Sequence, residues 1–69
     1  MADILLMPRI LRLKHAPSYV GTNINFFNEI IRPNLTEIPL GSKGVGFDRH
    51  ELDHWVDVYK KQYGRKSSR

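Results

Sequence analysis

Residues 14–31 read KHAPSYVGTNINFFNEII, and this stretch carries the signals for two short helices joined by a tight turn. Pro17 suits the first turn of a helix, where its missing N–H leaves no bond unmade. Gly21 follows, and glycine is the residue that most readily adopts the left-handed conformation that ends a helix. Thr22 and Asn23 are both candidates to cap the helix that comes next. We therefore expect a helix over about 14–20, a glycine turn and a second helix.

The second helix is expected from about Asn23 to Ile31, and Pro33 should end it because the residue before a proline avoids the helical region. Apolar residues recur on one face at helical spacing, namely Ile24, Phe27 and Ile31, with Phe26 and Ile30 beside them. The opposite face is polar and holds Asn25, Asn28, Glu29 and Arg32. This helix thus has one face for packing and another for solvent or a partner.

A hairpin is expected after the second helix, with short strands over Glu37–Leu40 and Val45–Phe47. Gly41–Gly44 joins them as a four-residue loop. Pro39 restricts its strand to the edge of a sheet, because proline cannot donate to a ladder of hydrogen bonds. Before the first helix, Ile10–Leu13 alternates weakly and is either a short strand or an extended lead-in.

The last helix is expected to begin at Asp48, with Glu51 three residues later as in a capping box. An apolar stripe then runs through Leu52, Trp55, Val56, Tyr59 and Tyr63. Val58 falls off this stripe and is a candidate for a self-association patch. The aromatic residues expected in the core are Tyr19, Phe26, Phe27, Phe47 and Trp55. The predicted fold is α+β and mostly helical, with three short helices and a two-stranded hairpin.

Length and composition restrict the chain to one small domain. It has 69 residues and no cysteine, which excludes disulfides, thiolate nucleophiles and cysteine-based zinc sites. The apolar run Ile4–Met7 is too short for a signal peptide or a membrane span, so we expect a cytoplasmic protein. The expected divisions are a flexible leader over 1–8, a folded domain over 9–63 and a disordered basic tail over 64–69.

The positive charge is concentrated near the end of the chain. The net charge is +4, and the residues from Lys60 onward carry five basic groups and no acid, which leaves −1 on the rest. A basic excess suggests an acidic partner, of which nucleic acid is the commonest. The tail is either an arm that contacts phosphates or a solubilising segment. Arg9, Arg12 and Lys14 are interpreted as surface charge.

The order of these elements resembles the winged helix-turn-helix proteins of the AlpA and phage-excisionase group, which are related to MerR-type domains. The resemblance covers about residues 9–58 and is carried by Leu11–Gly21, Phe26-Phe27, Arg32-Pro33, Gly41–Phe47 and Glu51–Trp55. It implies that the helix after the glycine turn enters the major groove of DNA. It also implies that the hairpin forms a wing that touches the backbone or the minor groove.

The resemblance makes Asn23–Arg32 the recognition helix. Asn25, Asn28 and Arg32 are then implied to contact bases, because asparagine can bind adenine with two hydrogen bonds and arginine can bind guanine or a phosphate. Contacts to the DNA backbone are expected from Asn23, Ser42, Lys43, Lys60, Lys61, Arg65 and Lys66.

The function implied by the resemblance is that of an excisionase, also called a recombination directionality factor, from a bacterium or phage. Such a protein binds and bends double-stranded DNA at an attachment site, steers an integrase toward excision and can associate with itself on DNA. One alternative is an AlpA-like transcription regulator. Another is a small protein-interaction module or anti-repressor without DNA binding, which Glu29 and the uncharged start of the second helix favour.

His50–His54 reads HELDH and matches the zinc-protease pattern His-Glu-x-x-His. At about 100° per residue, both histidines fall opposite the apolar stripe of the last helix and face solvent rather than a substrate cleft. His15 is the only other histidine and lies in the predicted first helix. We therefore expect no enzyme, no catalytic residue, no metal site and no cofactor.

Overall fold

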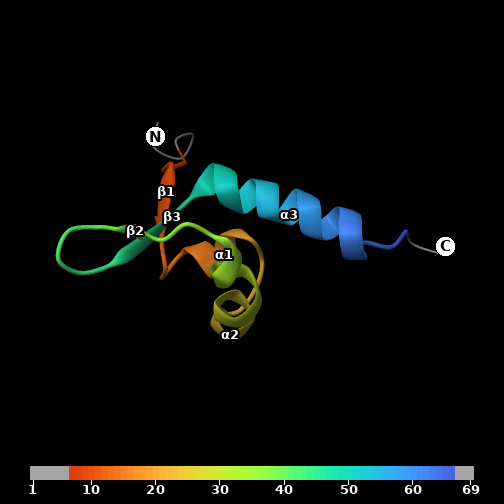
Figure 1. The fold of residues 1–69 in the computed structure, drawn as a ribbon, viewed down its shortest axis with the longest axis horizontal. Coiled ribbons are helices and arrows are strands. Elements are labelled where there is room, and N and C mark those ends of the chain that lie inside the picture. The colour runs from red at the N-terminus through yellow and green to blue at the C-terminus, as the bar shows by residue number, and fades with distance from the viewer. Residues whose placement is uncertain (1–6, 67–69) are drawn as a thin grey trace.

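The structure is a computed structural model that describes residues 7–66 of the chain. It has the predicted α+β class, with helices packed against an antiparallel sheet (Figure 1). In chain order the elements are β1 (Ile10–Arg12), α1 (Ala16–Tyr19), α2 (Ile24–Phe26), the π-helix η2 (Phe27–Ile31), the 3-10 helix η3 (Arg32–Asn34), β2 (Ile38–Pro39), β3 (Val45–Asp48) and α3 (Arg49–Tyr63). None of the helices within residues 7–66 has the length and apolar character needed to cross a membrane.

The sheet has three strands in the order β1-β3-β2, so the predicted two-stranded hairpin is part of a larger sheet. The central strand pairs with β1 from Ile10 opposite Asp48 to Arg12 opposite Gly46. On its other side it pairs with β2, where Pro39 lies on the edge as expected. The segment before the first helix is therefore a strand rather than an extended lead-in, because β3 supplies its hydrogen-bond partners.

The core lies between the sheet and the helices. Phe27 of η2 and Phe47 of β3 are both fully buried, and their rings meet edge to face at 5.2 Å between centroids. Four more buried residues surround them, namely Leu11, Ala16, Ile31 and Leu52. Tyr19, Phe26 and Trp55, also expected in the core, are only partly buried at its margin. The core therefore draws at least one residue from each of β1, α1, η2, β3 and α3.

The first helix is shorter than predicted, although its proline and the glycine that follows it have the roles expected from the sequence. It covers Ala16–Tyr19 instead of 14–20, with Pro17 in its first turn. Gly21 has the left-handed φ of +78° that the turn requires. The residues before the helix form a turn in which the His15 N–H donates to the carbonyl of Arg12 at 2.8 Å. This turn replaces the first helical residues that we expected.

Of the two cap candidates for the second helix, Asn23 is the cap. Its side-chain oxygen accepts a hydrogen bond from the Phe26 N–H at 2.8 Å. The Thr22 hydroxyl instead donates to the carbonyl of Pro17 at 3.3 Å and thereby ties the turn to α1.

The second helix is not a regular α-helix. It widens after its first turn, because the Arg32 N–H donates to the carbonyl of Phe27, five residues back. Phe27 and Ile31 are buried, but Ile24 is 45% exposed, so its predicted place on the buried face is wrong. Ile24 is the first helical residue, and the packed turn begins only after it.

Pro33 does not end the helical segment as expected. It lies in the first turn of η3, which continues to Asn34. A proline is tolerated there because the N–H groups of a first turn need no partner within the helix.

At the start of α3, Asp48 is the cap and accepts a hydrogen bond from the His50 N–H at 3.0 Å. The predicted capping box is wrong, because Glu51 does not bond back to Asp48. Its carboxylate accepts from the N–H and the hydroxyl of Thr36, at 2.9 and 3.1 Å. Glu51 therefore fastens α3 to the segment between η3 and β2.

The apolar stripe of α3 is buried only at its beginning. Leu52 is fully buried and Trp55 and Val56 are half-buried, whereas Tyr59 and Tyr63 are 36% and 64% exposed. The reason is visible in Figure 1, where the second half of α3 extends past the rest of the domain. Tyr59 still meets Phe26 edge to face at 6.4 Å between ring centroids, whereas Tyr63 at the end of the helix is largely exposed.

An ion pair joins the residue before β1 to the junction between β3 and α3. Arg9 donates from Nε and Nη2 to the two carboxylate oxygens of Asp48, at 2.8 and 2.9 Å. The bond from Arg9 lowers the pKa of Asp48 to about 2, and the backbone bond from His50 adds to this effect. Residues 1–6 of the predicted leader lie outside the described residues, and the carbonyl of Pro8 accepts from Arg49 Nε at 3.1 Å.

We predict that Asp48→Asn lowers the melting temperature near neutral pH and that this loss shrinks as the pH falls. The pKa of Asp48 is lowered by folding, from 3.8 to about 2, so its contribution is present above the unfolded value and lost toward pH 2. Asparagine still caps helices, so the variant removes mainly the ion pair with Arg9. Thermal melts followed by circular dichroism across this pH range measure the difference.

Glu29→Gln is the matched control for this experiment, because Glu29 is an exposed acidic residue of η2 that takes no part in the pairing of Arg9 with Asp48. It should change the melting temperature little at any pH. A difference between wild type and Asp48→Asn that is as large near pH 2 as at neutral pH would contradict the role of the ion pair.

Candidate nucleic-acid interface

The α2–η2 segment buries one face and exposes the other. Phe27 and Ile31 have no exposed surface, whereas Asn25, Asn28 and Glu29 are exposed. We call these three exposed residues the polar face. Because the buried side chains anchor the segment to the sheet, the polar face is held in a fixed orientation toward solvent.

Arg32 lies beside the polar face and is held by three contacts. Its Nε donates to Glu37 Oε2 at 2.7 Å, and its Nη1 donates to Asn28 Oδ1 at 3.1 Å. The guanidinium carbon also lies 5.9 Å from the centroid of the Phe47 ring, within cation–π range. The structure thus brings together two of the three predicted base-reading residues, Asn28 and Arg32.

The ion pair with Glu37 places a carboxylate next to this group. The bond from Arg32 lowers the pKa of Glu37, so the pair is charged at neutral pH. The side chains of Arg32 and Glu37 are 28% and 46% exposed, which leaves the pair open to solvent on one side.

Asn23 has its side-chain oxygen committed to the helix cap. The residue is exposed, so its amide NH₂ group is what it can offer to a phosphate at the start of α2. Its predicted backbone contact is thus compatible with its role as a cap.

The loop between β2 and β3 projects from the sheet at one end of the molecule (Figure 1). Ser42 and Lys43 are exposed at its tip, between Gly41 and Gly44 with φ of +72° and +91°. The Leu40 N–H donates to the carbonyl of Gly44 at 3.1 Å and closes the loop. The predicted backbone-contacting residues of the wing therefore stand on a defined turn.

Arg12 of β1, predicted only as surface charge, is a further cation beside this loop. Its guanidinium lies over Gly44 so closely that a β-carbon there would be 2.5 Å from Nη2. The sequence alone does not place Arg12 here, because its position depends on the pairing of β1 with β3. In that pairing Arg12 lies opposite Gly46, two residues after Gly44. The loop end of the sheet consequently carries two cations, Arg12 and Lys43.

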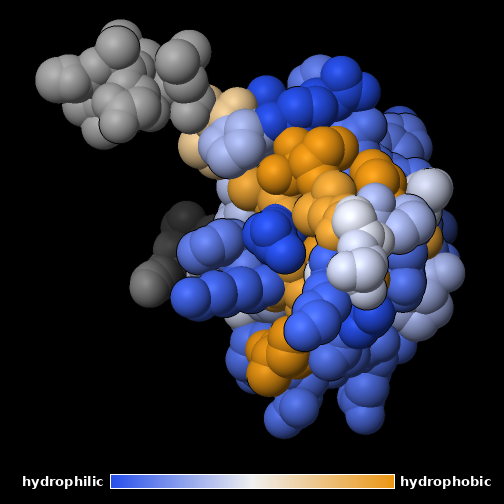
Figure 2. All heavy atoms as spheres, turned by 90° about the vertical axis from the view of Figure 1, so that its left-hand side faces the viewer, coloured by the Kyte–Doolittle hydropathy of each residue, from blue (hydrophilic) through white to orange (hydrophobic). Residues whose placement is uncertain are grey.

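Apolar residues support the base of the loop. Ile10 and Leu40 close over Gly46 on the outer face of the sheet, and both are half-buried. Figure 2 views the molecule from the loop end and shows apolar residues gathered in the middle with hydrophilic residues around them.

The basic residues near the end of the chain lie far from the loop. The helix α3 ends where the Gly64 N–H donates to the carbonyl of Lys60 at 2.8 Å. The loop and the end of α3 occupy opposite ends of the longest dimension, which measures 47 Å (Figure 1). The structure therefore separates the predicted phosphate contacts into a loop group, Ser42 and Lys43, and an end group, Lys60, Lys61, Arg65 and Lys66, all of them exposed.

The His-Glu-x-x-His segment lies in the first two turns of α3. His50 and His54 are exposed, and both oxygens of the Glu51 carboxylate accept hydrogen bonds from Thr36. Asp53 accepts a bond from the Tyr19 hydroxyl at 2.7 Å, which raises the pKa of that tyrosine. Among residues 7–66, no three His, Cys, Asp or Glu side chains are grouped so that they could hold a metal ion.

No protein-family model, curated protein or solved structure matches the chain.

We predict that the Glu37 carboxyl titrates below its usual pKa of 4.5 and that Arg32→Gln moves its midpoint back toward that value. The cause is the hydrogen bond from Arg32, which stabilises the charged carboxylate. Carbon-13 chemical shifts of the side-chain carboxyl, followed by NMR against pH, give the midpoint directly. Asn28→Ala is the control and should leave the Glu37 midpoint low, because Asn28 contacts Arg32 and not Glu37. An unchanged midpoint in Arg32→Gln would refute the pairing.

Proposed function

We propose that this chain is a sequence-specific DNA-binding protein of the winged helix-turn-helix type. The observation that carries the proposal is the polar face of α2–η2, which is exposed and backed by the buried Phe27 and Ile31. The Gly21 turn and the β2–β3 hairpin flank this segment in the order that such a fold requires. In this proposal α2–η2 enters the major groove, and the loop between β2 and β3 contacts the backbone.

The side chains on and beside the polar face have the chemistry for base recognition. Asn25 and Asn28 carry amide groups that can pair with adenine, and Arg32 can bind guanine. The ion pair of Arg32 with Glu37 is open to solvent, and exposed ion pairs contribute little to stability. In this proposal Arg32 therefore exchanges Glu37 for a guanine or a phosphate when DNA binds.

The proposed biological role is that of an excisionase, which bends attachment-site DNA and works with an integrase in the cytoplasm of a bacterium. An AlpA-like regulator would use the same surface, and the location of the bound site distinguishes the two. Glu29 is the observation that favours a second candidate of another class, a protein-interaction module. It is exposed on the polar face and would repel phosphates.

A gel shift on DNA that flanks the gene for this protein tests the proposal. At low salt we expect a complex that survives excess random competitor DNA, and footprinting would then locate the site and its repeats. Sites within an attachment region support the excisionase role, and sites over a promoter support the regulator. Absence of a specific complex at low salt would overturn DNA binding and favour the interaction module.

We predict that Asn28→Ala reduces the preference for the footprinted site over random DNA by about 5- to 150-fold, the equivalent of one bidentate base contact. Affinity for random DNA should change little, because Asn28 carries no charge. Fluorescence anisotropy with both DNAs gives the ratio. Gln62→Ala is the control, since it removes an exposed amide from α3, away from the polar face. Equal weakening on both DNAs would show that Asn28 does not read sequence.

We also predict that deletion of residues 64–69 flattens the salt dependence of DNA affinity and leaves sequence preference intact. The deletion removes Arg65, Lys66 and Arg69, and each lost phosphate contact lowers the log–log slope by about 0.9. Preference should persist because residues 64–69 follow α3 and include none of the predicted base-reading residues Asn25, Asn28 and Arg32. Arg65→Lys with Arg69→Lys retains the charge and should retain the slope. A truncated protein with the wild-type slope would show that the tail is not a DNA arm.

A further inference from the structure

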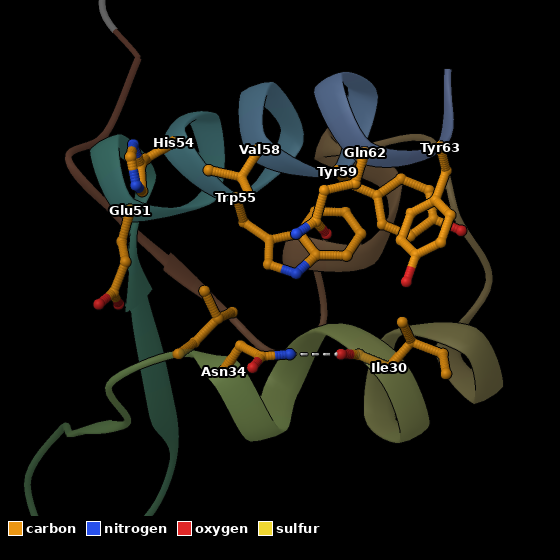
Figure 3. Close-up of a pocket in the computed structure, with 10 residues that line it drawn as sticks. Ile30, Asn34, Glu51, His54, Trp55, Val58, Tyr59, Gln62 and Tyr63 are labelled. Atoms are coloured by element: carbon orange, nitrogen blue, oxygen red, sulfur yellow. Dashed lines mark hydrogen bonds between the residues drawn. The ribbon is translucent and has the colours of Figure 1, made fainter. Parts of the chain in front are cut away.

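A groove with both apolar and polar lining residues runs along α3 on the side that faces η2 and η3. Figure 3 shows Trp55, Tyr59 and Tyr63 reaching from α3 toward Ile30. The Trp55 and Tyr59 rings stack at 4.7 Å between centroids, and Tyr63 continues the series at 4.8 Å from Tyr59. Leu35 lines the groove on the η3 side.

Several apolar side chains along this groove are exposed to solvent. Val58 and Tyr63 of α3 are 39% and 64% exposed, and Ile30 across the groove is 42% exposed. Single exposed apolar residues are ordinary, but a contiguous set marks a site of association. The second half of α3 thus presents an apolar surface that residues 7–66 leave uncovered.

The charges of α3 change sign at the middle of this surface. Within α3, Arg49, Glu51, Asp53 and Asp57 precede Val58 with a net charge of −2, and Lys60 and Lys61 follow it, with Arg65 and Lys66 just beyond the helix. Glu51 and Asp53 accept hydrogen bonds from Thr36 and Tyr19. Among residues 7–66, no hydrogen bond or ion pair engages the side chains of Asp57, Lys60 or Lys61. Asp57 and Lys61 are four residues apart, so they lie close together on the surface of the helix, both on one side of Val58.

We propose that the groove is covered by a second copy of this chain, with the two α3 helices antiparallel about a two-fold axis near Val58 and Tyr59. In this arrangement the acidic half of each α3 faces the basic half of the other, and Asp57 faces Lys61 of the second copy. A parallel arrangement would set like charges against each other. The charge pattern therefore favours a second copy of the chain as the partner. The surface is self-complementary, as a two-fold interface requires.

The apolar residues satisfy the same symmetry. Trp55 lies four residues before Tyr59 and Tyr63 lies four residues after it, so each Trp55 opposes a Tyr63 across the axis. Val58 lies at the centre, where an interface is most completely desolvated. This association needs no nucleic acid and goes beyond the proposed DNA binding.

Sedimentation equilibrium of the full chain without DNA tests the dimer. Between about 10 µM and about 1 mM, a range in which weak complexes form, the mass should rise from 8.1 kDa toward twice that value. A mass of 8.1 kDa at every concentration would overturn the proposal.

A pair of matched variants locates the interface. Val58→Asp should abolish the increase in mass, whereas Ile24→Asp should retain it. The two residues are similarly exposed, at 39% and 45%, but Ile24 lies on α2 outside the groove. Circular dichroism confirms that both variants are folded. A dimer that persists in Val58→Asp, or that is lost in Ile24→Asp, would overturn the assignment to this groove.

Charge exchange tests the antiparallel direction. Asp57→Lys and Lys61→Asp should each weaken self-association about tenfold, because each sets like charges against each other twice in the dimer. An equimolar mixture of the two single variants should restore association as a heterodimer, and so should the chain that carries both changes. The mixture is decisive, since helix stability within one chain cannot restore association between two chains. A mixture that stays monomeric would overturn the antiparallel arrangement.

Discussion

The edge-to-face contact between Phe27 and Phe47 is the interaction on which the rest of the structure depends. It joins the irregular second helix to the central strand, and both rings are fully buried. Phe47 is also the ring beneath the Arg32 guanidinium, so the same contact positions a charged group at the surface. In a chain of 69 residues there is little other buried apolar area to replace it.

The exposed features follow from this anchor. Burial of Phe27 and Ile31 turns Asn25, Asn28 and Glu29 outward, which creates the polar face. The central strand meanwhile holds β1 and β2 in register, and that register brings Arg12 to the loop that carries Lys43. The polar face and the loop are therefore products of one small core, whereas the end of α3 lies outside its influence.

This division explains why the molecule offers two surfaces of different character. One surface consists of the polar face of α2–η2 and the cationic loop, which are the parts used in the proposed DNA binding. The other is the aromatic series of α3, which meets Phe26 at Tyr59 and becomes more exposed toward Tyr63. The charge reversal near Val58 is the reason to propose a second copy of the chain as the partner of this second surface.

The sequence by itself determined the Gly21 turn, the Asp48 cap, the hairpin and the polarity of the second helix, because these depend on neighbours within a few residues. Only the tertiary structure decided the third strand, the choice of Asn23 over Thr22 as the cap, the π-turn of the second helix, the bond of Glu51 to Thr36 and the position of Arg12 at the loop. Most of these join segments distant in the chain or depend on what packs against them. Local spacing carries no information about such partners, so Asn25, Asn28 and Arg32 could be predicted from the sequence, whereas the pairing of Arg32 with Glu37 and the place of Arg12 became visible only in the folded chain.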